Sequence, residues 1–148
     1  MKNYKSKLPV LRLVKEPTDY YSSKVITSHD ASIVARNIWN DDIGIYESFY
    51  AIYLNCANRT IGVSKISQGG VSGTVVDVRL VLKYGISVLA SSIILVHNHP
   101  SGNLQPSKTD IDLTKKCVEA AKIMDMCVVD HIILTEESHI SMADEGLI

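Results

Sequence analysis

The sequence lacks the features that mark several specialised classes of protein. Its 15 basic and 16 acidic residues are mixed along the 148-residue chain, without the lysine or arginine block typical of a nucleic-acid-binding surface. No apolar run approaches the roughly 18 residues that a membrane-spanning helix needs. The basic N-terminus is followed by a short apolar stretch that Pro9 and Arg12 interrupt, which argues against a signal peptide. We therefore expect no membrane association.

Cysteine is scarce, and its spacing indicates no metal or disulfide framework. The three cysteines, Cys56, Cys117 and Cys127, contain no CxxC pair, and an odd number suits reduced thiols better than disulfides. We expect all three to be core thiols. Reduced thiols indicate a reducing compartment, and the predicted location is the cytoplasm.

Internal repeats, low-complexity tracts and long glycine or serine linkers are also absent. A chain of 148 residues with 46% hydrophobic residues suits one globular domain that buries its own core. The sequence therefore predicts a single domain over 1–148. Residues 1–28 are interpreted as an N-terminal extension that is too short for an independent core.

What is present is an alternation of helical and strand-like patterns. Apolar residues recur at helical spacing in three segments, 28–39, 77–89 and 107–124. Apolar or β-branched runs typical of strands occupy six segments, 10–14, 48–54, 60–67, 92–96, 128–134 and 139–142. The second and third of these runs flank a turn-forming stretch and predict a hairpin. This order predicts an α/β fold in which a mixed β-sheet is flanked by helices.

The third predicted helix opens with Ser107 and Asp110, which resemble a capping box with Asp in place of Glu. Asp110 lies three residues before the first member of the apolar stripe and therefore projects from the same side of the helix. We expect Asp110 to face the interior. The expected inward stripe is Leu113, Cys117, Ala120, Ala121 and Met124.

Two histidines, His97 and His99, stand where the run over 92–96 ends and a loop over 98–106 is expected. A bare His-x-His is more often a pair of loop histidines, and Ser107 with Asp110 could be only a helix cap. Together with an inward Asp110, however, the histidines form the three-ligand set that catalytic zinc sites use, with one position left for water. We predict one zinc ion per chain, bound by His97, His99 and Asp110.

The same residues resemble the signature of the JAMM (MPN-domain) metalloproteases, which is His-x-His, seven residues, Ser, two residues, Asp. This pattern runs from His97 to Asp110 without a gap. Asn98, the following Pro-Ser-Gly and the segment 141–146 are similar to the bacterial RadC branch, named as DNA repair proteins. The resemblance extends from about Glu47 to the end of the chain. It implies a cytidine-deaminase-like three-layer sandwich and the hydrolysis of peptide or isopeptide bonds.

The resemblance also implies a glutamate at the start of an upstream strand that serves as proton shuttle. Glu47, immediately before the run over 48–54, matches that place. From the residues alone, Glu47 could equally be a solvated charge at a strand entry. Four other carboxylates are available upstream of the histidines, namely Glu16, Asp41, Asp42 and Asp77.

Four further polar residues can be interpreted with the same reasoning. The resemblance implies that the hydroxyl of Ser107 stabilises the tetrahedral oxyanion, although its role as helix N-cap has at least equal support. His131 is interpreted as a structural or supporting residue, because a fourth protein ligand would close the position that a catalytic zinc keeps open. His29 and His139 are expected at the surface.

These patterns predict a zinc-dependent hydrolase whose peptide or isopeptide substrate the sequence does not name. The alternative is a non-catalytic metal-containing module associated with DNA repair or protein binding. RadC-like proteins usually carry an N-terminal helix-hairpin-helix region, and residues 1–28 contain no such pair, which argues against direct nucleic-acid binding. A zinc nucleobase deaminase is excluded because its Pro-Cys-x-x-Cys pattern is missing. An HNH nuclease is also excluded, because the His, Asn and His of that class are dispersed through a β-hairpin and a helix, whereas His97, Asn98 and His99 are contiguous here.

Overall fold

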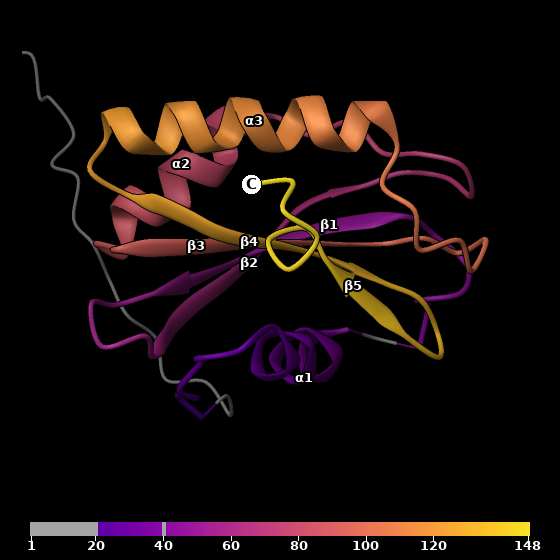
Figure 1. The fold of residues 1–148 in the computed structure, drawn as a ribbon, viewed down its shortest axis with the longest axis horizontal. Helices are drawn as coiled ribbons and strands as arrows, with labels where there is room; N and C mark the ends of the chain where they lie inside the picture. The colour runs from indigo at the N-terminus through magenta and orange to yellow at the C-terminus, as the bar shows by residue number, and fades with distance from the viewer. Residues whose placement is uncertain (1–20, 40) are drawn as a thin grey trace, which may run out of the picture.

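The computed structural model describes residues 21–39 and 41–148, so the strand expected over 10–14 lies outside the described residues. Its elements are α1 (Ser28–Ile38), β1 (Ser48–Leu54), β2 (Thr60–Gln68), α2 (Val78–Ser87), β3 (Ser92–Asn98), α3 (Lys108–Ile123), β4 (Cys127–Leu134) and β5 (His139–Ser141). Helices α2 and α3 cover one face of the sheet, and α1 covers the other (Figure 1). The predicted α/β class, a mixed sheet flanked by helices, is confirmed.

The sheet contains five strands in the order β2-β1-β3-β4-β5. Strand β1 forms the predicted hairpin with β2 and pairs antiparallel with β3 on its other side. Strands β3 and β4 are parallel, and α3 makes the crossover between them. The C-terminal end of β3 and the first turn of α3 therefore lie at the same edge of the sheet, where the predicted ligands are found.

The core is divided between the two faces of the sheet. Side chains alternate along a strand, so successive residues of β1 and β3, which are buried on both faces, enter different clusters. Phe49 and Leu95 pack with α2 and α3, whereas Ile52 and Ile94 pack with α1. The same alternation decides which face of the sheet receives each residue of the histidine motif.

The N-termini of two helices are fixed by side-chain caps. Helices α1 and α3 each start with a capping box, formed by Thr27 with Asp30 and by Ser107 with Asp110. The box predicted at Ser107 is therefore confirmed. Among the described residues, no helix has the length and apolar character needed to cross a membrane.

Several expectations about individual side chains were wrong. Met124 is exposed, because it is the C-cap of α3 and lies beyond the last turn that packs on the sheet. Cys56 and Cys127 are exposed, since one lies in the β1–β2 turn and the other opens β4, and only Cys117 is a buried thiol. Asn98 is the last residue of β3 and not part of the following loop.

Candidate metal centre

The three predicted ligands meet at the end of β3. His97 is in β3 and His99 directly follows the strand, where its N–H still donates to the carbonyl of Leu134 on β4, so both imidazoles project toward α3. Asp110 reaches the same point from the first turn of α3. The Nε2 atom of His97 lies 2.8 Å from Nε2 of His99 and 3.3 Å from Oδ1 of Asp110, and Nε2 of His99 lies 3.7 Å from Oδ2 of Asp110. The fold therefore brings together the whole predicted set.

These separations fit a metal ion held by all three residues. Tetrahedral zinc with bonds of about 2.0–2.2 Å separates its ligand atoms by about 3.3 Å. The three candidate ligand atoms lie within 4.8 Å of one another. The Nδ1 atom of His99 lies 2.5 Å from the backbone carbonyl oxygen of Asn103, which can only accept a hydrogen bond. A neutral His99 thus carries its proton on Nδ1 and directs the lone pair of Nε2 into the cluster.

Burial and pairing set the charges of the cluster. Burial lowers the pKa of His97 to about 4, which keeps this imidazole in the neutral form that metal binding requires. The hydrogen bond with Asp110 raises the pKa of His99. Burial opposes ionisation of Asp110, but the pairing with His99, whose pKa is raised, and the hydrogen bonds from the hydroxyl and backbone N–H of Ser107 outweigh burial and hold the pKa of Asp110 well below the usual range. The cluster therefore offers the ionised carboxylate of Asp110 beside the neutral imidazole of His97.

A cavity of about 670 Å³ opens over the cluster, and Glu47 is part of its lining. The register of β1 against β3 places Phe49 opposite His97, so the residue just before β1 comes close to the ligands. Burial raises the pKa of Glu47, the charge of His99 lowers it, and the carboxylate of Asp110 raises it again. Glu47 is thus a partly buried carboxylate that shares its cavity with the metal cluster.

The other carboxylates considered from the sequence do not share this place. Among the described residues that line the cavity, the acidic ones are Glu47 and Asp110. Asp77 is the N-cap of α2, where its side chain accepts a hydrogen bond from the backbone of Arg79. Asp41 and Asp42 are not among the lining residues, and Glu16 lies outside the described residues. Position therefore favours Glu47 over the alternatives.

Ser107 and His131 contact the cluster from outside it. The Oγ atom of Ser107 accepts a hydrogen bond from the backbone N–H of Asp110 and donates one to Oδ2 of the same residue, at 2.6 Å. The structure thus shows the capping role, and the oxyanion role stays a prediction. His131 is fully buried on β4, and its Nε2 lies 2.8 Å from Nδ1 of His97, the ring nitrogen of His97 that does not face His99. It contacts a ligand and is not itself directed at the cluster.

Asn98, between the two histidines, has a structural role that the sequence did not reveal. Alternation turns its side chain to the face opposite the histidines, where it is fully buried. Its Oδ1 accepts a hydrogen bond from the N–H of Ser48 at 2.7 Å, and its Nδ2 donates to the carbonyl oxygens of Ile43 and Tyr46 at 2.6 and 2.7 Å. These bonds attach the backbone on both sides of Glu47 to the strand that carries the histidines.

The fold and the site together define a class: a three-layer α/β domain with a His-His-Asp group, at the end of a central strand, that could hold a metal ion. The family described as the RadC-like JAB domain matches residues 21–147, and the chain belongs to this family. The resemblance inferred from the motif is therefore confirmed. Family and cluster together fit a metal-dependent hydrolase.

Similar curated proteins share this region of the chain. A UPF0758 protein of Flavobacterium johnsoniae is 42% identical over 124 residues, which cover 84% of this chain and 53% of the relative. A UPF0758 protein of Fusobacterium nucleatum is 37% identical over 145 residues, covering 98% of this chain and 60% of the relative. A third, from Syntrophomonas wolfei, is 41% identical over 139 residues, covering 93% and 54%. The chain thus spans little more than half the length of these relatives.

Proposed function

We propose that this domain is a zinc-dependent hydrolase that cleaves peptide or isopeptide bonds. The observation that carries the proposal is the convergence of His97, His99, Asp110 and Glu47 on one cavity. The first three residues would hold the ion. When bound, zinc would lower the pKa of a water molecule toward roughly 7 and polarise the substrate carbonyl.

Glu47 would serve as the proton shuttle of this reaction. A carboxylate whose pKa is raised by burial is a better base than one in free water, because its pKa moves toward the working pH. Glu47 would accept a proton from the attacking water and later donate it to the leaving amine. The backbone N–H of Thr74 lowers the pKa of the Glu47 carboxyl and so offsets part of the effect of burial.

The remaining parts of the proposal follow from the same cavity. Ser107 would stabilise the oxyanion after its hydroxyl turns away from Asp110, to which it donates in the structure. The partner is proposed to be a peptide or isopeptide substrate and not a nucleic acid. A cavity of about 670 Å³ has room for a short extended segment of peptide.

The test combines metal content with hydrolysis. We expect about one zinc ion per chain in protein purified without chelators, and loss of zinc in His97→Ala and Asp110→Asn. Asp112→Asn is the matched control, because Asp112 is an exposed residue of the same helix. Parent protein that takes up no stoichiometric metal would overturn the proposed metal centre.

Glu47→Gln separates catalysis from metal binding. The amide keeps the shape of the side chain and loses the base, so we expect full zinc content and a loss of hydrolysis of about 100-fold or more, measured on a panel of fluorogenic peptides and isopeptides. An unchanged rate would remove Glu47 from the mechanism. Zinc bound stoichiometrically by a parent that cleaves no member of the panel would favour the non-catalytic metal-containing module instead.

A further inference from the structure

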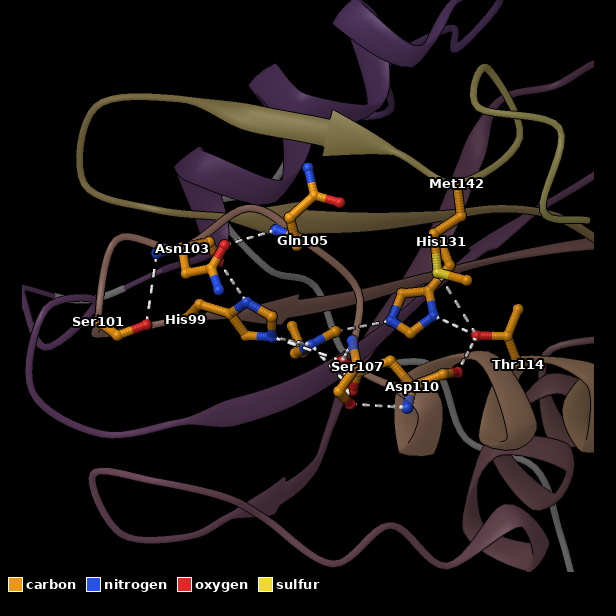
Figure 2. A network of polar contacts seen from close by, with 10 residues as sticks. His99, Ser101, Asn103, Gln105, Ser107, Asp110, Thr114, His131 and Met142 are labelled. Atoms are coloured by element: carbon orange, nitrogen blue, oxygen red, sulfur yellow. Dashed lines mark hydrogen bonds and ion pairs between the residues drawn. The ribbon is translucent and has the colours of Figure 1, made fainter.

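A chain of buried polar groups lies behind His97 and leads to the backbone of another ligand. Nδ1 of His131 lies 2.6 Å from Oγ1 of Thr114, on α3. This hydroxyl lies 2.6 Å from the backbone carbonyl oxygen of Asp110. Figure 2 shows the side chains of His131, Thr114 and Asp110 that form this series, and the contact of His131 with His97 extends it to a second ligand. His97, His131 and Thr114 are each at most 1% exposed, so water does not interrupt it.

The donor and acceptor in each of these hydrogen bonds can be assigned by starting from the backbone carbonyl of Asp110. A carbonyl oxygen can only accept, so the hydroxyl of Thr114 donates its single proton to Asp110. The oxygen of Thr114 then accepts the Nδ1–H of His131. Thr114 Oγ1 also lies 3.7 Å from Sδ of Met142, a weak acceptor that does not compete with a carbonyl at 2.6 Å.

The proton position on His131 also decides which atom donates in its hydrogen bond with His97. His131 is fully buried, and its two ring nitrogens face only His97 and the hydroxyl of Thr114, so no carboxylate balances a second ring proton and the ring has one N–H. With that proton on Nδ1, the Nε2 atom of His131 has a lone pair and accepts the Nδ1–H of His97. A neutral His97 with its proton on Nδ1 has a lone pair on Nε2, the atom that faces His99 and Asp110.

We propose that Thr114 and His131 are positioning residues that hold His97 in the tautomer whose Nε2 can bind the metal. The proposal rests on the proposed metal centre and deepens it. If the chain ran in the opposite direction, the proton of His97 would lie on Nε2 and compete with the ion. Histidine ligands usually donate their second ring N–H to a carboxylate or carbonyl, and losing such a partner lowers metal affinity by roughly 10–100-fold. Here the backbone carbonyl of Asp110 is the final acceptor, and the side chains of Thr114 and His131 connect it to the Nδ1–H of His97.

Substitution of Thr114 removes the hydroxyl with little change in shape. In Thr114→Val, the Nδ1–H of His131 loses its acceptor, so His131 can move its proton to Nε2 and donate to His97, which then carries its own proton on Nε2. We expect zinc affinity, measured by competition with a chelating dye, to fall roughly 10–100-fold. Thr114→Ser keeps the hydroxyl and should restore the affinity. Glu119→Gln, a change at an exposed position of α3 that does not line the cavity, should leave it unaltered.

A second readout uses the metal-free protein and needs no bound ion. Ring ¹⁵N NMR at pH 8 should show His97 protonated on Nδ1 in the parent and in Thr114→Ser, and a larger share of the Nε2–H form in Thr114→Val. Equal zinc affinity of Thr114→Val and the parent would overturn the proposal. So would an Nε2–H tautomer of His97 in the parent, a result that stands even if the valine variant does not fold. A parent that binds no zinc contradicts the proposed function instead, and its spectrum still decides the tautomer.

Discussion

Asn98→Asp tests how the site is held in place, because a single atom of the side chain changes. The substitution keeps the size of the residue and the oxygen that accepts from Ser48. It replaces the nitrogen that donates to the carbonyl oxygens of Ile43 and Tyr46 by a second oxygen. An ionised carboxylate would then place that oxygen against two carbonyl oxygens at a fully buried position.

The expected cost follows from these contacts. An ionised carboxylate loses both hydrogen bonds, each worth about 0.5–1.5 kcal/mol, and the groups that they satisfied retain part of their desolvation penalty. A buried carboxyl avoids charge by keeping its proton, with which it can donate to one of the two carbonyls. We expect the free energy of unfolding to fall by about 2–4 kcal/mol at pH 7, a large share of the roughly 5–15 kcal/mol typical of a domain.

The sign of the pH dependence is also determined. Burial raises the pKa of the new carboxyl in the folded state above its unfolded value of about 4. Above about pH 4 the unfolded state therefore loses this proton while the folded state still keeps it. The variant therefore loses stability as pH increases toward its folded pKa, and its deficit relative to the parent is smaller at pH 4.5 than at pH 7. Urea unfolding followed by circular dichroism at the two pH values measures this difference.

Asn55→Asp provides the matched control. The Oδ1 atom of Asn55 accepts from the N–H groups of Ala57 and Arg59, both at 3.0 Å, and a carboxylate can replace it in both bonds. We expect a change within about 0.5 kcal/mol. Similar losses in Asn55→Asp and Asn98→Asp, or a deficit of Asn98→Asp that does not grow with pH, would refute the reasoning.

Two further predictions concern the loop beside the cavity and the core beneath it. A Cβ atom on Gly69 would overlap the carbonyl oxygen of Gly73, so Gly69→Ala should lower stability by about 1–3 kcal/mol in thermal unfolding. Gly70→Ala, with no atom within 4 Å, should have little effect, and equal losses would contradict this account. Burial raises the pKa of Tyr53 to about 12, and its hydroxyl donates to the carbonyl of Val81 at 2.9 Å. Tyr53→Phe should cost about 1–2 kcal/mol at pH 9. This deficit should shrink as pH rises from about 10 toward 12, because the folded state disfavours the phenolate, and a constant deficit in urea unfolding would contradict the burial argument.

Local patterns in the sequence were enough to predict the elements and their class. Helical periodicity located α1, α2 and α3, and runs of β-branched and aromatic residues located the strands from β1 to β5. Errors occurred at element ends, as at Asn98 and Met124, where periodicity fades and packing against the sheet decides the last residue. The exposure of Cys56 and Cys127 was missed for a related reason, since composition indicates a buried thiol on average and not at a given position.

The ligand set was predictable because its geometry is local. The alternation of a strand places His97 and His99 on one face, and the first turn of the next helix presents Asp110 a short loop away. These relations depend on backbone geometry within one continuous segment. The sequence by itself therefore determined the candidate metal centre of this domain.

Only the tertiary structure decided what surrounds that centre. Glu47 was distinguished from other carboxylates by the antiparallel register of β1 against β3, and the contact of His131 with His97 depends on the parallel register of β3 against β4. A slip of one residue in either pairing would turn these side chains to the opposite face of the sheet. Thr114 enters the site only because α3 packs over that register. Such contacts join segments distant in sequence, and no local pattern encodes them.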